Sequence, residues 1–152
     1  MILLDTNVVS EPLRPAPAIA VVAWLDAHFD ACAISAITVL ELSIGMQALP
    51  KGRRRDRLHA AVSLAMRRFG SRILGFEEGA ARAAASLFER AKAGGLPLHQ
   101  TPLKLADLQI AGVAVANGLS LATRNVADFR GLGIDLIDPW SAATPSPVRP
   151  TA

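Results

Sequence analysis

Five short apolar segments recur along the chain, separated by longer segments in which apolar and polar positions follow a helical spacing. Apolar runs of this length, bounded by turn residues, are typical of strands buried on both faces of a parallel sheet. The predicted strands are residues 2–4, 31–34, 72–76, 119–123 and 134–137. The longer segments predict helices at about residues 17–28, 35–49, 54–69, 77–92 and 102–116.

This alternation predicts an α/β fold of three layers, with a central parallel sheet of about five strands and helices on both faces. We expect one domain over residues 1–140, because the length suits one hydrophobic core and no linker divides it. Residues 141–152 are rich in Pro, Ser and Thr and are predicted to form a flexible tail. The residues that the helical period assigns to the core in segment 35–49 are Ile37, Leu40, Ile44 and Leu49.

Composition and charge narrow the class of protein. Hydrophobic residues make up 51% of the chain, which excludes a largely disordered protein. The absence of Tyr and an aromatic share of 5% argue against a base-stacking surface. A net charge of +3 and a pI near 9.8 suit a polyanionic partner. Lys and Arg gather in segments 51–57 and 67–72, where a solvated helix surface and contacts to phosphate groups are equally good interpretations.

The sequence carries no sign of export or membrane insertion. The N-terminus lacks the basic region of a secretory signal, and the longest uncharged stretch, residues 108–123, is too short and too often interrupted by polar residues to span a bilayer. The single cysteine, Cys32, lies in an apolar segment and is predicted to be a small buried hydrophobic residue. We therefore expect a cytoplasmic protein without a membrane partner.

Polar side chains follow two of the predicted strands. Asp5 comes directly after the first strand, and Thr123, Asn125 and Asp128 lie at or after the end of the fourth. The carboxyl ends of parallel strands meet at one edge of a sheet, so we expect these residues to converge there. Asp5 also has a simpler interpretation, since Asp is a common turn and N-cap residue.

Two further acids stand among apolar neighbours on predicted helices. Glu41 is flanked by Leu40 and Leu42, where a carboxylate is costly to bury unless something pairs with it. An exposed position at the edge of the helix is the simpler interpretation. Asp107 lies about five residues into the helix predicted at 102–116, beyond the first turn in which the helix dipole favours an acid, so the dipole explains little.

Acids that converge without a neutralising Lys repel one another, and a hard divalent cation is their natural occupant. Mg²⁺ or Mn²⁺ held by oxygen ligands activates a water and stabilises the charge that develops in phosphodiester cleavage. The histidines, His28, His59 and His99, are too scattered for a zinc site. The sequence also contains no glycine-rich phosphate loop and no Gly-x-Ser-x-Gly nucleophile.

Segments from residue 1 to about 140 resemble the PIN-domain family, and within it the VapC-type (FitB-like) toxins of bacterial type II toxin–antitoxin modules. The matching segments are 2–12 (ILLDTNVVSEP), 34–45 (ISAITVLELSIG), 105–114 (LADLQIAGVA), 122–129 (ATRNVADF) and 134–140 (IDLIDPW). The resemblance implies a PIN-like fold and a metal-dependent endoribonuclease. Its implied partners are RNA as substrate, a small cognate antitoxin of the VapB or FitA type, and a second copy of the chain in a homodimer.

The resemblance also implies roles for individual residues. Asp5 and Asp107 would be the principal Mg²⁺ ligands, and Glu41 would bind the metal directly or through water, or orient the attacking water. The family's fourth acidic position falls either at Asn125, which brings no charge, or at Asp128. The residues whose hydroxyl groups would support the site are Thr6 and Thr123.

Two alternative functions belong to other classes. A catalytically silent member would bind antitoxin or RNA without cutting, and Asn125 leaves room for this. An aspartyl phosphotransfer or phosphatase domain would use Asp5 as nucleophile. Such a site needs a second acid two residues after the first, where this chain has Asn7, or a paired acid and lysine, for which Lys104 is the candidate by motif.

Overall fold

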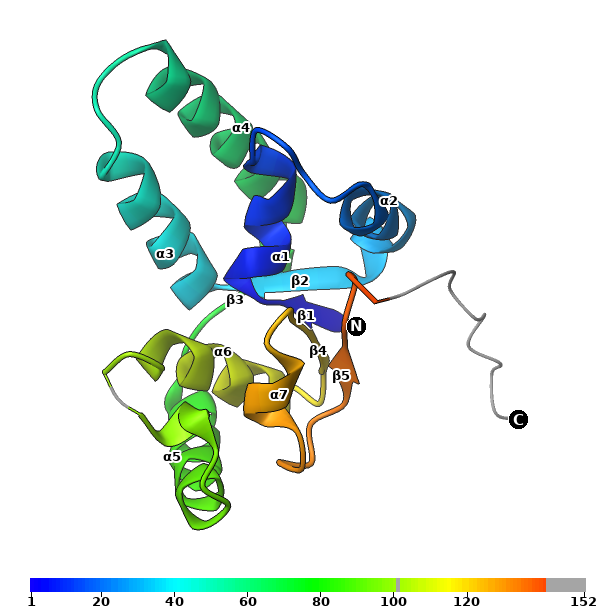
Figure 1. The fold of residues 1–152 in the computed structure, drawn as a ribbon, viewed down its shortest axis with the longest axis vertical. Helices are drawn as coiled ribbons and strands as arrows, with labels where there is room; N and C mark the ends of the chain where they lie inside the picture. Colours follow the sequence, from blue (N-terminus) through cyan, green and yellow to red (C-terminus); the bar gives the residue numbers. More distant parts are fainter. Residues whose placement is uncertain (101, 142–152) are drawn as a thin grey trace.

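The computed structural model describes residues 1–100 and 102–141, and its centre is a sheet of parallel strands (Figure 1). The strands lie in the order β3-β2-β1-β4-β5. All four pairings are parallel, which confirms the predicted α/β class and the five-stranded sheet. The strands are β1 (Ile2–Leu4), β2 (Cys32–Ser35), β3 (Ile73–Leu74), β4 (Ser120–Ala122) and β5 (Leu136–Ile137).

Helices connect the strands and cover both faces of the sheet. The α-helices are α1 (Thr6–Ser10), α2 (Ile19–His28), α3 (Ala36–Gln47), α4 (Arg53–Phe69), α5 (Glu78–Ala93), α6 (Leu105–Ala116) and α7 (Val126–Phe129). Four 3-10 turns complete the described chain, namely η1 (Glu11–Leu13), η2 (Phe29–Ala31), η3 (Gly70–Arg72) and η4 (Pro97–His99). None of the helices in the described ranges is long and apolar enough to cross a membrane.

Side chains that alternate along the strands divide the core into two clusters. Leu3 and Leu121 point to one face, where they pack with α5 and α6. Leu4 and Ala122 point to the opposite face, where they pack with α1, α2 and the end of α4. Cys32 belongs to the second cluster, and burial raises the pKa of its thiol to about 11. The predicted buried cysteine is confirmed.

The ends of α3 and α6 differ in how well the sequence signals them. Ser35 caps α3, because its hydroxyl accepts a hydrogen bond of 3.0 Å from the backbone N–H of Thr38. Helix α6 begins at Leu105, three residues later than predicted. The predicted cap, Thr101, lies outside the described residues, as does the predicted tail beyond Ser141.

The predicted core of α3 was partly wrong. Leu40 and Ile44 are 54% and 58% exposed, whereas the residues that α3 buries are Thr38 and Leu42. Helices α3 and α4 form an antiparallel pair that extends from the sheet, so none of the described segments forms a layer over the outer side of α3 (Figure 1). Helical spacing marks an apolar stripe but does not say what the stripe faces.

Helices α5 and α6 approach closely along a contact that has no room for a side chain on α6. A Cβ atom at Gly112 would lie 2.5 Å from the carbonyl oxygen of Ala80 and 2.8 Å from the Cβ of Ala84. Small residues on both helices, Ala80 and Ala84 on α5 and Gly112 on α6, permit this close packing. It fixes α6, which carries Asp107, against the rest of the fold.

Gly112→Ala is expected to lower the free energy of unfolding by about 1–3 kcal/mol, because the added methyl group forces the two helices apart. The matched control is Gly45→Ala in α3, where no atom lies within 4 Å of the new Cβ and the gain in helix propensity is up to about 1 kcal/mol. Urea denaturation followed by circular dichroism measures both. Equal stability of the two variants would contradict the close contact.

Candidate active site

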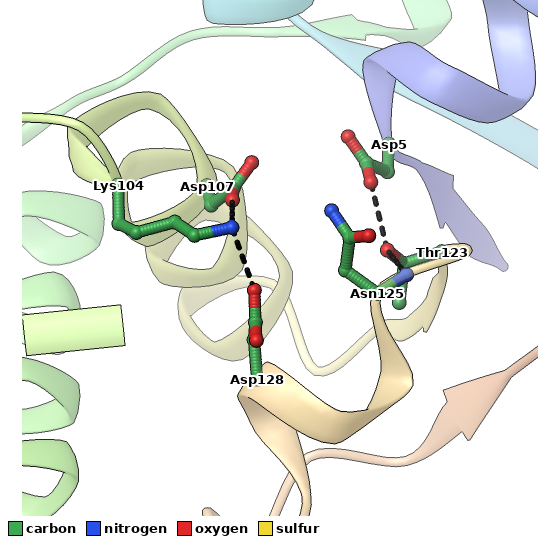
Figure 2. A network of polar contacts seen from close by, with 6 residues as sticks. All are labelled: Asp5, Lys104, Asp107, Thr123, Asn125 and Asp128. Carbon is green, nitrogen blue, oxygen red and sulfur yellow. Dashed lines mark hydrogen bonds and ion pairs between the residues drawn. The ribbon is translucent and has the colours of Figure 1, made fainter. Parts of the chain in front are cut away.

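The candidate site lies at the carboxyl edge of the sheet, where β1 and β4 end side by side. Leu4 and Ala122 are paired in register, so the residues that follow them, Asp5 and Thr123, lie next to each other. Parallel strands therefore produce the predicted convergence. The other side chains that reach this edge are Glu41 from α3, Asp107 and Lys104 at the start of α6, and Asn125 and Asp128 after β4. Figure 2 shows all of these except Glu41.

Asp5 is held rigidly and is only 4% exposed. Its carboxylate accepts a hydrogen bond of 2.7 Å from the Thr123 hydroxyl, which in turn accepts one of 3.0 Å from the backbone N–H of Asn125 (Figure 2). Asp5 precedes α1, yet its side chain makes no capping hydrogen bond. The carboxylate is thus oriented toward the site by Thr123, and the simple N-cap interpretation does not account for it.

Glu41 is half-buried and does not lie on an exposed edge of α3. Its carboxylate accepts a hydrogen bond from the Thr6 hydroxyl. Burial raises the pKa of the Glu41 carboxyl, the Thr6 hydrogen bond lowers it, and the negative charges of Asp5 and Asp107 raise it further. The three acids are therefore close enough to interact electrostatically.

Asp107 lies in the first turn of α6, because the helix begins at Leu105. The sequence-based argument that the helix dipole explains little is therefore wrong, since a carboxylate in the first turn is favoured by the dipole. Burial nevertheless raises the pKa of the Asp107 carboxyl, as does the charge of Asp5, while Lys104 opposes the shift. Dipole compensation alone does not account for a half-buried acid that faces a second acid.

Lys104 is the residue at this site that sequence reasoning undervalued. Its ammonium nitrogen lies 2.7 Å from Oδ2 of Asp128 and 3.3 Å from Oδ2 of Asp107 (Figure 2). The hydrogen bond to Asp128 is the main cause that raises the pKa of Lys104. The expectation that the acids converge without a neutralising Lys is therefore wrong. The spacing of Lys104 and Asp107, three residues apart at the start of a helix, was the available signal.

The two candidates for the fourth position differ in their surroundings. Asp128 is engaged by Lys104, whereas the Asn125 side chain points into the space between Asp5 and Asp107 (Figure 2). Asn125 does not cap α7 with its side chain. The structure brings both residues to the site, and the roles of all the predicted site residues stay predictions.

The donors of the site are oxygens of carboxylates, hydroxyls and an amide, which fit a hard divalent cation such as Mg²⁺ rather than zinc. Within residues 1–100 and 102–141, no three acidic, His or Cys side chains are yet gathered closely enough to surround one ion. Each histidine contacts a residue of its own turn or helix, as seen for His28, His59 and His99.

The basic segments divide into two groups. Arg72 donates hydrogen bonds to the carbonyl oxygens of Phe29 and Cys32, and Arg68 lies 4.1 Å above the Phe29 ring, so these two side chains bind the fold together. The arginines at the start of α4 are exposed and line an open pocket beside η1. They are Arg53, Arg54 and Arg57. Contact with phosphate stays a prediction for this second group.

Comparison with known proteins gives consistent matches over most of the chain. The model of the PIN domain family matches residues 2–133. The chain is 39% identical to Toxin FitB of Neisseria gonorrhoeae over 142 residues, which covers 92% of this chain and 99% of that protein. It is 41% identical to VapC ribonuclease Y4jK of Sinorhizobium fredii over 148 residues, covering 94% and 100%.

Solved structures agree with these matches. The structure of FitAcB from Neisseria gonorrhoeae superposes with a TM-score of 0.82 at 39% identity, covering 93% of this chain and 99% of the other. DNA-bound VapBC from Salmonella typhimurium superposes with a TM-score of 0.73 at 27% identity, covering 91% and 97%. The chain therefore belongs to the PIN-domain family and, within it, to the group of VapC- and FitB-type proteins.

Proposed function

We propose that this protein is a metal-dependent endoribonuclease that acts as the toxin of a toxin–antitoxin system. The observation that carries the proposal is the convergence of Asp5, Glu41 and Asp107 at the carboxyl edge of the sheet, where the charges of Asp5 and Asp107 both raise the pKa of Glu41. Two similar proteins bear the names VapC ribonuclease and Toxin FitB, which supports the same class of activity.

In this proposal Asp5, Glu41 and Asp107 hold Mg²⁺, or alternatively Mn²⁺. The bound ion would activate water and stabilise negative charge on the phosphate. Thr123 and Thr6 keep the carboxylates of Asp5 and Glu41 in place through their hydroxyl groups. The oxygen of the attacking water bonds to phosphorus and the bond to the 3′ oxygen breaks, which leaves a 5′-phosphate and a 3′-hydroxyl. Glu41 is placed to orient that water and accept its proton.

Two alternatives remain distinguishable from hydrolysis. An aspartyl phosphotransfer site would use Asp5 as nucleophile with a nearby lysine, but Lys104 is paired with Asp107 and Asp128. A stable acyl-phosphate on Asp5 would revive that function. A catalytically silent member would bind antitoxin or RNA without producing new RNA ends.

Asp5→Asn and Asp107→Asn are each expected to reduce RNA cleavage by more than about 100-fold, because each removes a charged ligand while keeping the shape of the side chain. Cleavage of a panel of structured RNAs in MgCl₂, with sequencing of the new ends, measures the effect. Expression without an antitoxin should also cease to inhibit growth.

The matched control is Glu89→Gln, an acid-to-amide change at an exposed position of α5. It should leave cleavage unchanged. Circular dichroism should show that all three variants keep the fold. Undiminished cleavage by both aspartate variants would contradict the proposal.

The raised pKa values predict how stability depends on pH in the metal-free protein. A carboxyl whose pKa is higher in the folded state stabilises the fold at low pH, and this contribution is lost as the pH rises through the folded-state pKa. Glu41→Gln cannot ionise. In EDTA, the melting temperature of this variant should therefore increase relative to that of the wild type as the pH rises above 4.5, the ordinary pKa of a glutamate carboxyl.

Thermal denaturation of both proteins across this pH range measures the difference. Glu89→Gln serves again as the control and should show no such trend. Adding Mg²⁺ at neutral pH should favour the wild type, since its charged Glu41 can bind the ion. A difference that stays constant with pH would show that Glu41 carries no excess cost of ionisation.

We propose that a small antitoxin protein of the VapB or FitA type is the partner of this chain. Solved structures of similar proteins are the complexes FitAB and VapBC. An apolar pocket of about 190 Å³ between α2, α4 and the segment after β1 is the surface that suits an apolar side chain of such a partner. Residues lining it include Val22, Leu25, Val62, Met66 and Phe69.

We also propose that the protein forms a homodimer through the outer side of α3 and the start of α6. Leu40 and Ile44 of α3 are exposed there, and so are Leu103 and Leu105, while α3 and α6 contact each other. Large exposed hydrophobic residues on two adjacent elements are typical of an interface.

The double variant Leu40→Glu/Ile44→Glu is expected to be monomeric, because two charges would be buried in the dimer. Light scattering after size-exclusion chromatography measures the mass of the wild type and the variant. The matched control is Leu64→Glu, which changes an exposed leucine on α4 and should leave the dimer intact. A wild type that is monomeric at all concentrations would contradict the homodimer.

A further inference from the structure

Lys104 places a positive charge inside the candidate metal site. Its ammonium group bridges Asp128 at 2.7 Å and Asp107 at 3.3 Å. The three side chains are partly buried, with 27%, 14% and 19% of Lys104, Asp128 and Asp107 exposed, so solvent screens this contact less than a surface ion pair. Among the ion pairs in the described part of the chain, these two are the ones that involve acids of the site.

We propose that Lys104 is an internal counter-ion that competes with the metal for Asp107. In the metal-free protein it partly neutralises the acids, and metal binding requires it to withdraw from Asp107. This inference rests on the proposed metal-dependent function and adds to it a residue that sets the affinity for the metal.

Geometry makes the competition unavoidable at Oδ2 of Asp107. Its distance of 3.3 Å from the Lys104 nitrogen means that a Mg²⁺ ion held by the same oxygen would be a close neighbour of the ammonium group. Like charges that share one carboxylate oxygen repel, so the ion and the ammonium group would disfavour each other. The lone pairs of a single carboxylate are also divided between them.

Asp128 gives Lys104 a second position. It is the closer of the two partners, and its oxygen lies away from the space between Asp5 and Asp107 into which Asn125 points (Figure 2). Lys104 can therefore leave Asp107 while it remains paired with Asp128. In this arrangement Asp128 anchors Lys104 and does not bind the metal, and the side chain beside the ion is that of Asn125.

The test is the affinity of the metal-free, full-length protein for MgCl₂, measured by isothermal titration calorimetry. Lys104→Met is expected to bind Mg²⁺ up to about tenfold more tightly than the wild type, since a neighbouring positive charge is removed. Its melting temperature should fall in EDTA, where the acids lose their counter-ion, and should gain more than the wild type on addition of Mg²⁺.

Three controls isolate the contact. Lys92→Met removes an exposed lysine on α5 and should leave the Mg²⁺ affinity unchanged. This variant controls for the change in the net charge of the protein. Lys104→Arg keeps the charge and should bind Mg²⁺ as weakly as the wild type. Lys104→Gln repeats the test should the methionine variant fail to fold.

A double variant tests the part assigned to Asp128. In the Lys104→Met background, the further change Asp128→Asn should not alter the affinity for Mg²⁺ when Asp128 acts only through Lys104. A loss of affinity in that background as large as that caused by Asp107→Asn would identify Asp128 as a ligand and overturn this assignment.

The outcomes separate the inference from the proposed function. Equal Mg²⁺ affinities of the wild type, Lys104→Met and Lys104→Gln would overturn the competition while leaving the metal site intact. Absence of Mg²⁺ binding in the wild type and in every variant would instead overturn the metal dependence on which the inference rests. Asp107→Asn removes the carboxylate for which Lys104 and the metal compete. Its Mg²⁺ affinity therefore shows how weak binding becomes when a ligand is lost.

Discussion

Repulsion among acids held at one edge of a sheet is the constraint on which the rest of the site depends. Asp5, Glu41 and Asp107 interact electrostatically in a partly buried setting, and burial and repulsion raise the pKa values of Glu41 and Asp107. Such an arrangement persists only when the surrounding structure holds it. Hydroxyl groups of Thr123 and Thr6 and the ammonium group of Lys104 supply that support.

The fold provides the same support at a larger scale. The register of β1 and β4 fixes Asp5 beside Thr123, and the backbone N–H of Asp5 extends the ladder with a hydrogen bond of 2.9 Å to the carbonyl oxygen of Ala122. The sheet is covered by helices on both faces, so the strands cannot slide without exposing apolar side chains. Asp5 and Thr123 are thus held in place by the sheet itself.

Much of this arrangement follows from the sequence, for a physical reason. Strands buried on both faces are apolar throughout, so the run before Asp5 and the run before Thr123 were visible, and parallel topology then required their ends to meet. Glu41 and Asp107 could be singled out because a carboxylate among apolar neighbours is costly to bury unless it is paired or binds a ligand.

The features that the sequence did not reveal depend on contacts between distant segments. The exposure of Leu40 and Ile44 depends on how far the α3–α4 pair extends from the sheet, which no local pattern records. The pairing of Lys104 with Asp128 joins residues 24 positions apart and depends on where α6 begins. Whether Asn125 or Asp128 completes the site likewise depends on side-chain directions, which spacing alone does not give.

The absence of a side chain at Gly112 has a consequence for how the protein can change over time. Helix α6 carries Lys104 and Asp107 at one end and rests on the alanines of α5 along its length. Position and orientation of the acids are therefore set in part by residues that touch neither metal nor substrate. Larger side chains at Ala80 or Ala84 would lift α6 and displace Asp107. Genetic screens for loss of activity should recover α5 variants whose defect resembles that of a site mutation.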